Sequence, residues 1–174
     1  MSEEQVDFII VGAYALGAHG YPRATGDIDI WVKPNNTNSR KLYKALSRFG
    51  APLEQIEIDD FSMEGIIVQI GVIPRRIDII TKIDGVTYEE ADEDKITVEV
   101  EGLMLPVISL DKLIKNKFAI WGVEEPGQQG AKTLEYLDIP SFYTGNWTGC
   151  IGVQNVTLFL SEPLGCPLKS DVRN

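Results

Sequence analysis

Apolar and polar positions follow two different patterns at the start of the chain. Residues 6–11 are almost wholly apolar, which is typical of a buried strand, and Gly12 ends this run. A short helix is predicted directly after it, over residues 13–18. Residues 27–30 alternate polar and apolar side chains, and this period of two predicts a second strand. The chain is therefore expected to begin with a strand, a helix and another strand.

An amphipathic helix is predicted over residues 39–49. Leu42, Leu46 and Phe49 recur at helical spacing, and Gly50 is a common helix stop. Four further strands are predicted, at residues 66–72, 75–81, 95–100 and 103–108. The mixture of strands and helices predicts an α/β (α+β) domain.

The last two of these strands are predicted to form a hairpin. Glu101 and Gly102 lie between them, and a short connection that contains glycine is typical of such a turn. Ser109 follows as the predicted N-cap of a helix, because its hydroxyl can accept a hydrogen bond from a free backbone N–H of the first turn.

The chain changes character after residue 121. Residues 122–130 are rich in Gly, Gln and Glu and contain a proline, which predicts a linker. Residues 131–138 could form one more short helix, whereas residues 146–160 show no strong period. We therefore expect one domain over residues 1–121 and an extension of unknown role over residues 122–174, for which a divergent or read-through origin is a hypothesis.

Composition narrows the class of protein. With 174 residues and 44% hydrophobic content the chain can form an ordinary core, and no apolar stretch approaches the roughly 20 residues needed to span a membrane. The acidic start is unlike a signal peptide, so a cytoplasmic protein is expected. The net charge of −10 opposes nonspecific binding to nucleic acid. Cys150 and Cys166 are expected to be free thiols.

Three aspartates are the candidates for chemistry. Asp27 and Asp29 lie two residues apart on a predicted strand, so their side chains share one face. Asp78 lies between Ile77 and Ile79 on another predicted strand and could bring a third carboxylate to the same place. Carboxylates that lie close together repel one another unless a cation or a shared proton offsets the repulsion. Oxygen ligands of this kind suit Mg²⁺ or Mn²⁺, which predicts a metal site for phosphoryl-group chemistry.

Gly12 lies where the first strand is expected to turn into a helix. A glycine at such a turn lets the backbone approach a ligand closely, and the N–H groups that follow can face an anion. A phosphate-binding turn beside a metal site is what transfer from a nucleoside triphosphate requires.

At these residues the chain resembles the nucleotidyltransferase superfamily that includes DNA polymerase beta. The resemblance is carried by Val11-Gly12-Ala13, by Asp27-Ile28-Asp29-Ile30 and by Ile77-Asp78-Ile79, in the family's order and spacing. Over residues 6–118 the chain is most similar to the small bacterial and archaeal nucleotidyltransferases related to the abortive-infection toxin-antitoxin enzymes. Two departures are that Ala13 replaces the usual Gly or Ser and that the family's continuation after Lys117 is not recognisable.

The resemblance implies a nucleotidyltransferase-like mixed β-sheet flanked by helices, and it implies roles for the acidic residues. Asp27 and Asp29 would hold Mg²⁺ or Mn²⁺, and Asp78 would bind the second of two metal ions or accept the proton of the acceptor hydroxyl. Gly12 and Ala13 would present backbone N–H groups to the phosphates.

The basic candidates are fewer. Arg23 is a candidate triphosphate contact because guanidinium pairs with phosphate oxygens, and the resemblance suggests a basic contact to the nucleotide near Lys117. Neither Arg75 nor Arg76 is assigned a catalytic role, since Arg76 is expected to share the face of Asp78 poorly. His19 is expected to make a local hydrogen bond.

The predicted activity is transfer of a nucleoside monophosphate from an NTP such as ATP to an acceptor hydroxyl. Relatives suggest that the acceptor is a tyrosine or serine of a partner toxin, or a tRNA 3′ end, and the acidic balance of the chain favours a protein. The main alternative is a catalytically silent, antitoxin-like domain of the same fold that binds a partner protein. A metal-dependent phosphohydrolase is less favoured because such enzymes usually add histidines, and this chain has one. A purely structural domain is the remaining alternative.

Overall fold

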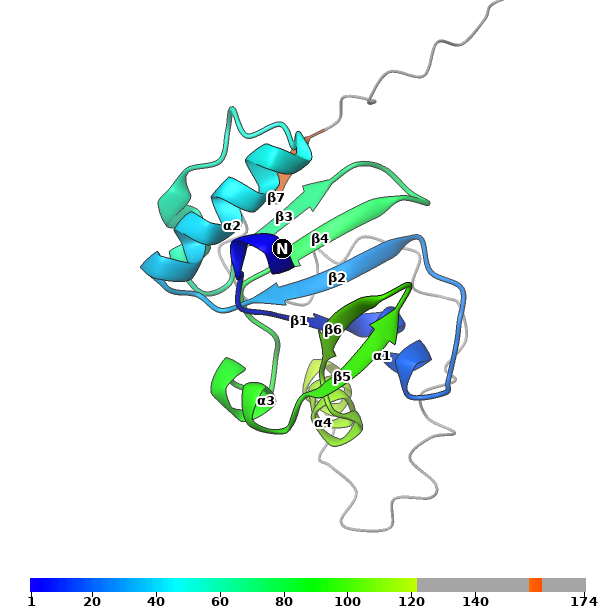
Figure 1. The fold of residues 1–174 in the computed structure, drawn as a ribbon. Coiled ribbons are helices and arrows are strands. Elements are labelled where there is room, and N and C mark those ends of the chain that lie inside the picture. The colour runs from blue at the N-terminus through cyan, green and yellow to red at the C-terminus, as the bar shows by residue number, and fades with distance from the viewer. Residues whose placement is uncertain (122–156, 161–174) are drawn as a thin grey trace, which may run out of the picture.

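The computed structural model describes residues 1–121 and 157–160. Within these residues the strands form one mixed sheet in the order β5-β6-β1-β2-β4-β3-β7 (Figure 1). The strands are β1 (Phe8–Val11), β2 (Asp27–Val32), β3 (Ile67–Ile70), β4 (Arg76–Ile80), β5 (Ile96–Val100), β6 (Leu103–Val107) and β7 (Thr157–Leu160). The mixed α/β class predicted from the sequence is therefore confirmed.

Helices flank this sheet. They are α1 (Gly12–Ala18), α2 (Asn36–Phe49), α3 (Tyr88–Asp94) and α4 (Leu110–Trp121), with 3-10 turns at Ser2–Glu4 and Ile58–Ser62. Helix α1 contacts α4, and α2 packs against the second 3-10 turn. In Figure 1, α2 lies near β3 and β4, whereas α3 and α4 lie near the hairpin of β5 and β6. Within the described residues no helix is long and apolar enough to cross a membrane.

The core is built around β1, which lies inside the sheet. All four residues of β1 are buried, so side chains on both faces of the strand are covered. Trp31 and Val32 of the neighbouring strand β2 are also buried, and Trp31 packs edge to face on Tyr88 of α3. A sheet covered on both faces holds its strands in a fixed register.

This register determines where the aspartates lie. Strands β1 and β2 are antiparallel, with Val11 opposite Asp29. Strands β2 and β4 are parallel, and Asp29 pairs with Asp78 while Asp27 pairs with Arg76. The chain turns from β1 into α1 at Gly12, one residue after Val11, so this turn lies beside the Asp29 position.

Most predicted elements are present within one to three residues of their expected ends. Helix α2 begins before the predicted residue 39, because the side chain of Asn35 caps it by accepting a hydrogen bond from the Asn38 backbone N–H at 2.8 Å. The hairpin turn is confirmed, with positive φ at Glu101 and Gly102. Ser109 accepts from the Lys112 backbone N–H at 3.4 Å, at the start of α4.

Two elements were not predicted. Helix α3 begins at a capping box in which Thr87 and Glu90 exchange side-chain to backbone hydrogen bonds. Strand β7 lies in the stretch 146–160, where the sequence shows no strong period, and it pairs in parallel with β3. The predicted linker at 122–130 and the helix at 131–138 lie outside the described residues.

Candidate active site

The sheet brings the three aspartates to one face. Asp29 and Asp78 are direct partners on the parallel strands β2 and β4, and Asp27 precedes Asp29 by two residues on β2. Successive side chains of a strand alternate between faces, so residues two apart point to the same side. The predicted grouping of Asp27, Asp29 and Asp78 is thus what the strand pairing produces.

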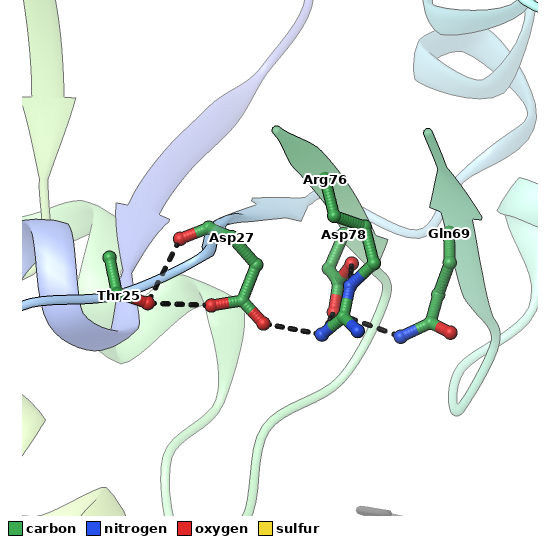
Figure 2. Close-up of polar contacts among 5 residues, drawn as sticks. All are labelled: Thr25, Asp27, Gln69, Arg76 and Asp78. Carbon is green, nitrogen blue, oxygen red and sulfur yellow. Dashed lines mark hydrogen bonds and ion pairs between the residues drawn. The ribbon is translucent and has the colours of Figure 1, made fainter. Parts of the chain in front are cut away.

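Arg76 lies among these carboxylates. Its Nε donates to Oδ1 of Asp78 at 2.7 Å, and its Nη2 donates to Oδ2 of Asp78 at 3.0 Å. The same Nη2 also forms an ion pair with Oδ2 of Asp27 (Figure 2). The expectation that Arg76 shares the face of Asp78 poorly is wrong, because the two residues are two apart on β4 and therefore point to the same side.

Two uncharged side chains extend this network. The hydroxyl of Thr25 donates to Oδ1 of Asp27 at 2.6 Å, and Nε2 of Gln69 donates to Oδ2 of Asp78 at 3.1 Å (Figure 2). Gln69 reaches Asp78 because the two residues are partners in the antiparallel pair of β3 and β4. Neither side chain was among the predicted site residues.

Asp29 differs from the other two aspartates in its electrostatic surroundings. Burial raises its pKa first, and the negative charges of Asp27 and Asp78 raise it further, to about 6. The positive charges of Lys117 and Arg76 oppose this rise without cancelling it. The neighbouring cations therefore do not fully offset the burial and the repulsion that disfavour ionised Asp29.

The turn at Gly12 lies against Asp29. The backbone of Gly12 has a φ of +66°, a conformation that residues with a Cβ rarely adopt. A Cβ placed on Gly12 would lie 2.9 Å from Cγ of Asp29 and closer still to its Oδ2. Both the conformation and the space at this position therefore require glycine. The next residue, Ala13, is buried within α1.

The two predicted basic contacts approach the same region. Arg23 lies exposed on the loop between α1 and β2, and Lys117 lies on α4. Burial lowers the pKa of Lys117, the charge of Arg23 lowers it further, and the charge of Asp29 acts in the opposite direction. Arg23, Lys117 and Asp29 thus belong to one electrostatic neighbourhood. His19 makes a hydrogen bond, as expected, but the bond is not local: its Nε2 lies 2.8 Å from the carbonyl oxygen of Ile108, which is 89 residues away in the sequence.

The fit of a metal ion depends on Arg76. Within the described part of the chain, no group of three His, Cys, Asp or Glu side chains is arranged to hold a metal ion. In Figure 2 the guanidinium of Arg76 lies between the carboxylates of Asp27 and Asp78. The donor set still suits a hard divalent cation, which would offset both the burial of the ionised Asp29 and its repulsion by Asp27 and Asp78. The residues therefore fit Mg²⁺ or Mn²⁺ provided that Arg76 moves aside.

Comparisons with known proteins bear on the fold. No protein-family profile matches the chain, and no curated protein matches it in sequence. Among solved structures, a crystal structure of a Thermotoga maritima protein provisionally described as a nucleotidyltransferase is similar to it. The likeness has a TM-score of 0.53 and 16% sequence identity, over 79% of this chain and 84% of that chain. This chain has a nucleotidyltransferase-like fold. At such low identity the likeness shows the fold alone.

Proposed function

We propose that the protein is a nucleotidyltransferase that moves a nucleoside monophosphate from an NTP to an acceptor hydroxyl and releases pyrophosphate. The observation that supports this most directly is the grouping of Asp27, Asp29 and Asp78 on one face of two parallel strands, beside the turn at Gly12. The similarity in fold to a protein described as a nucleotidyltransferase agrees with it.

Each part of the site has a role in this proposal. Asp27, Asp29 and Asp78 would hold Mg²⁺ or Mn²⁺, which when bound neutralises phosphate oxygens and orients the triphosphate. Asp78 binds the second metal ion or accepts the proton of the acceptor hydroxyl. The glycine turn makes room for the Asp29 side chain, and the backbone N–H groups of Gly12 and Ala13 would bind the phosphates beside it.

The basic side chains bind the rest of the triphosphate. Lys117 interacts electrostatically with both Arg23 and Asp29, which supports the approach of both cations to one ligand beside Asp29. Burial and a second cation disfavour the charged form of Lys117, which lowers its pKa. A bound anion would offset this cost. Guanidinium and ammonium groups placed together in this way are suited to a polyphosphate.

The acceptor is proposed to be a hydroxyl of a partner protein. A tRNA 3′ end is the other acceptor that the family resemblance suggests. The net charge of −10 opposes the binding of a nucleic-acid backbone, whereas it does not hinder the approach of a protein surface.

A second candidate function is favoured by one observation. Arg76 pairs with both Asp27 and Asp78 and offsets one of their two charges, which stabilises the cluster in part without any metal ion. The antitoxin-like alternative is a catalytically silent domain that binds a partner protein through its surface. Such a domain would need no metal ion at this cluster.

Calorimetric titration separates the two functions. The protein is titrated with each non-hydrolysable ribonucleoside triphosphate, with Mg²⁺ and with EDTA. We expect metal-dependent binding to the wild type, loss of binding in Asp27→Asn, and unchanged binding in Asp111→Asn, a control on the exposed start of α4. Absence of binding by folded wild-type protein for all four nucleotides would refute the enzymatic proposal and favour the silent domain.

The acceptor is tested separately with an α-labelled NTP and an extract of the host cell. Label that resists ribonuclease and is removed by protease identifies a protein acceptor. Label with the opposite sensitivities identifies RNA and contradicts the proposed protein acceptor.

A further inference from the structure

The hydrogen bonds of the carboxylate cluster leave little access for a metal ion. Oδ1 of Asp27 accepts from Thr25, and its Oδ2 is paired with Arg76. Oδ1 of Asp78 accepts from Arg76, and its Oδ2 accepts from both Arg76 and Gln69. Every carboxylate oxygen of these two aspartates therefore already has a hydrogen-bond donor, and three of the four have Arg76.

The contacts of Arg76 also show why it lies there. Its side chain is about one-fifth exposed, and the carboxylates of Asp27 and Asp78 are similarly enclosed, with 24% and 9% of their side-chain surface exposed. Ionised groups at this depth need opposite charges close by, and a guanidinium that bridges two carboxylates supplies one. A divalent cation at the same place would also offset the negative charges of Asp27 and Asp78. It would supply two positive charges, whereas the guanidinium supplies one.

We propose that Arg76 is a positioning residue that occupies the cation place between Asp27 and Asp78 and competes with the divalent metal for it. This inference rests on the proposed function, because it assumes that these aspartates bind a metal during turnover. In the metal-free protein Arg76 holds the two strands' carboxylates together. Metal binding then breaks its bonds to Oδ2 of Asp27 and to Asp78, and the guanidinium turns away.

The competition predicts an unusual direction of change. Removing a residue that merely supports the site would weaken metal binding or leave it unchanged. Removing a competing cation should strengthen it, because the metal no longer has to displace an ion pair. The matched control is Arg75, which is the adjacent arginine, is exposed, and precedes the first residue of β4.

The test is Mn²⁺ binding without nucleotide, measured from the electron paramagnetic resonance signal of free Mn²⁺. We expect Arg76→Gln to bind Mn²⁺ about tenfold more tightly than the wild type, a change that corresponds to the loss of one charge-assisted ion pair. Arg75→Gln should bind like the wild type. Arg76→Lys retains the charge but loses the bidentate geometry, so its affinity for Mn²⁺ should lie between those of the wild type and Arg76→Gln. It replaces the glutamine variant in the test where that variant fails to fold.

The outcomes distinguish this inference from the proposed function. Suppose that the wild type binds Mn²⁺. Equal or weaker binding by Arg76→Gln then overturns the competition and leaves the proposed function standing. The same result in Arg76→Lys does so where the glutamine variant does not fold. Binding by Arg76→Gln but not by the wild type supports the competition in its strongest form. Absence of Mn²⁺ binding in every folded protein overturns the metal site, and with it both proposals.

Discussion

Replacing Asp29 by asparagine should stabilise the metal-free protein. The pKa of Asp29 is raised from its ordinary value of 3.8 to about 6, first by burial and then by Asp27 and Asp78. A pKa that is higher in the folded state means that ionisation of this group opposes folding. The cost is fully present above the folded pKa and disappears as the pH falls towards the unfolded value. Asparagine has nearly the same shape and carries no charge, so it removes the cost.

The size of the effect follows from the shift. The change from 3.8 to about 6 corresponds to about 3 kcal/mol at neutral pH, since one pKa unit is worth about 1.4 kcal/mol. Asp29 keeps part of its contact with water, which screens the repulsion, so we expect about 1–2 kcal/mol. At pH 5 the folded carboxyl is mostly protonated while the unfolded one is mostly ionised, so about half of the difference should remain.

Urea denaturation in EDTA, at pH 7.5 and at pH 5, measures this difference in the free energy of unfolding. Asp27→Asn is the matched control, because Asp27 is paired with Arg76 and Thr25 and its loss should destabilise the fold. Added Mn²⁺ should reverse the order, by stabilising the wild type more than the Asp29 variant. An Asp29→Asn protein that is less stable than the wild type, or a gain that does not change with pH, would show that burial and the neighbouring carboxylates do not disfavour ionised Asp29 as described.

Two further predictions concern the glycine turn. Gly12→Ala should lower the free energy of unfolding by about 1–2 kcal/mol because of the positive φ, and it should also abolish nucleotide binding by displacing Asp29. Gly50 has a similar positive φ but open space around it, so Gly50→Ala should show the stability cost alone. The same denaturation and calorimetric measurements test both variants. Nucleotide binding by Gly12→Ala at wild-type affinity would place the phosphates elsewhere. Ala13→Ser, which restores the usual residue of the resembled family, should bind nucleotide at least as tightly as the wild type, and calorimetric loss of binding in a folded variant would contradict this.

Much of the site could be predicted because strand periodicity is local. The spacing of Asp27 and Asp29 alone places both carboxylates on one face, whichever strands surround them. The positive φ at Gly12 follows the same logic, since a glycine between a buried strand and a helix is where an unusual backbone conformation is expected. The pairing of Asp29 with Asp78 is different, because it depends on a parallel contact between β2 and β4 that no local pattern specifies.

The side chains around the aspartates depended on that long-range register. Gln69 reaches Asp78 only because β3 and β4 pair with these two residues opposite each other. Arg76 is the exception, since its spacing of two from Asp78 is visible in the sequence and by itself places both side chains on one face of β4. Helix α3 was missed for another reason: it is a seven-residue, mostly acidic helix without an apolar repeat, and its signal was the capping box of Thr87 and Glu90.

The three aspartates have different electrostatic surroundings, and this difference connects the fold with the proposed chemistry. Arg76 pairs with both Asp27 and Asp78 and offsets one of their two negative charges, whereas Asp29 retains repulsion that neither Arg76 nor Lys117 removes. An incoming triphosphate would add negative charge beside this cluster. A single guanidinium cannot offset the charges of both the carboxylates and the triphosphate. A divalent cation that arrives with the nucleotide can, because it carries twice the charge and binds carboxylate and phosphate oxygens together. The nucleotide itself should therefore favour the exchange of Arg76 for metal, so that metal binds more tightly when a triphosphate is present than when it is absent.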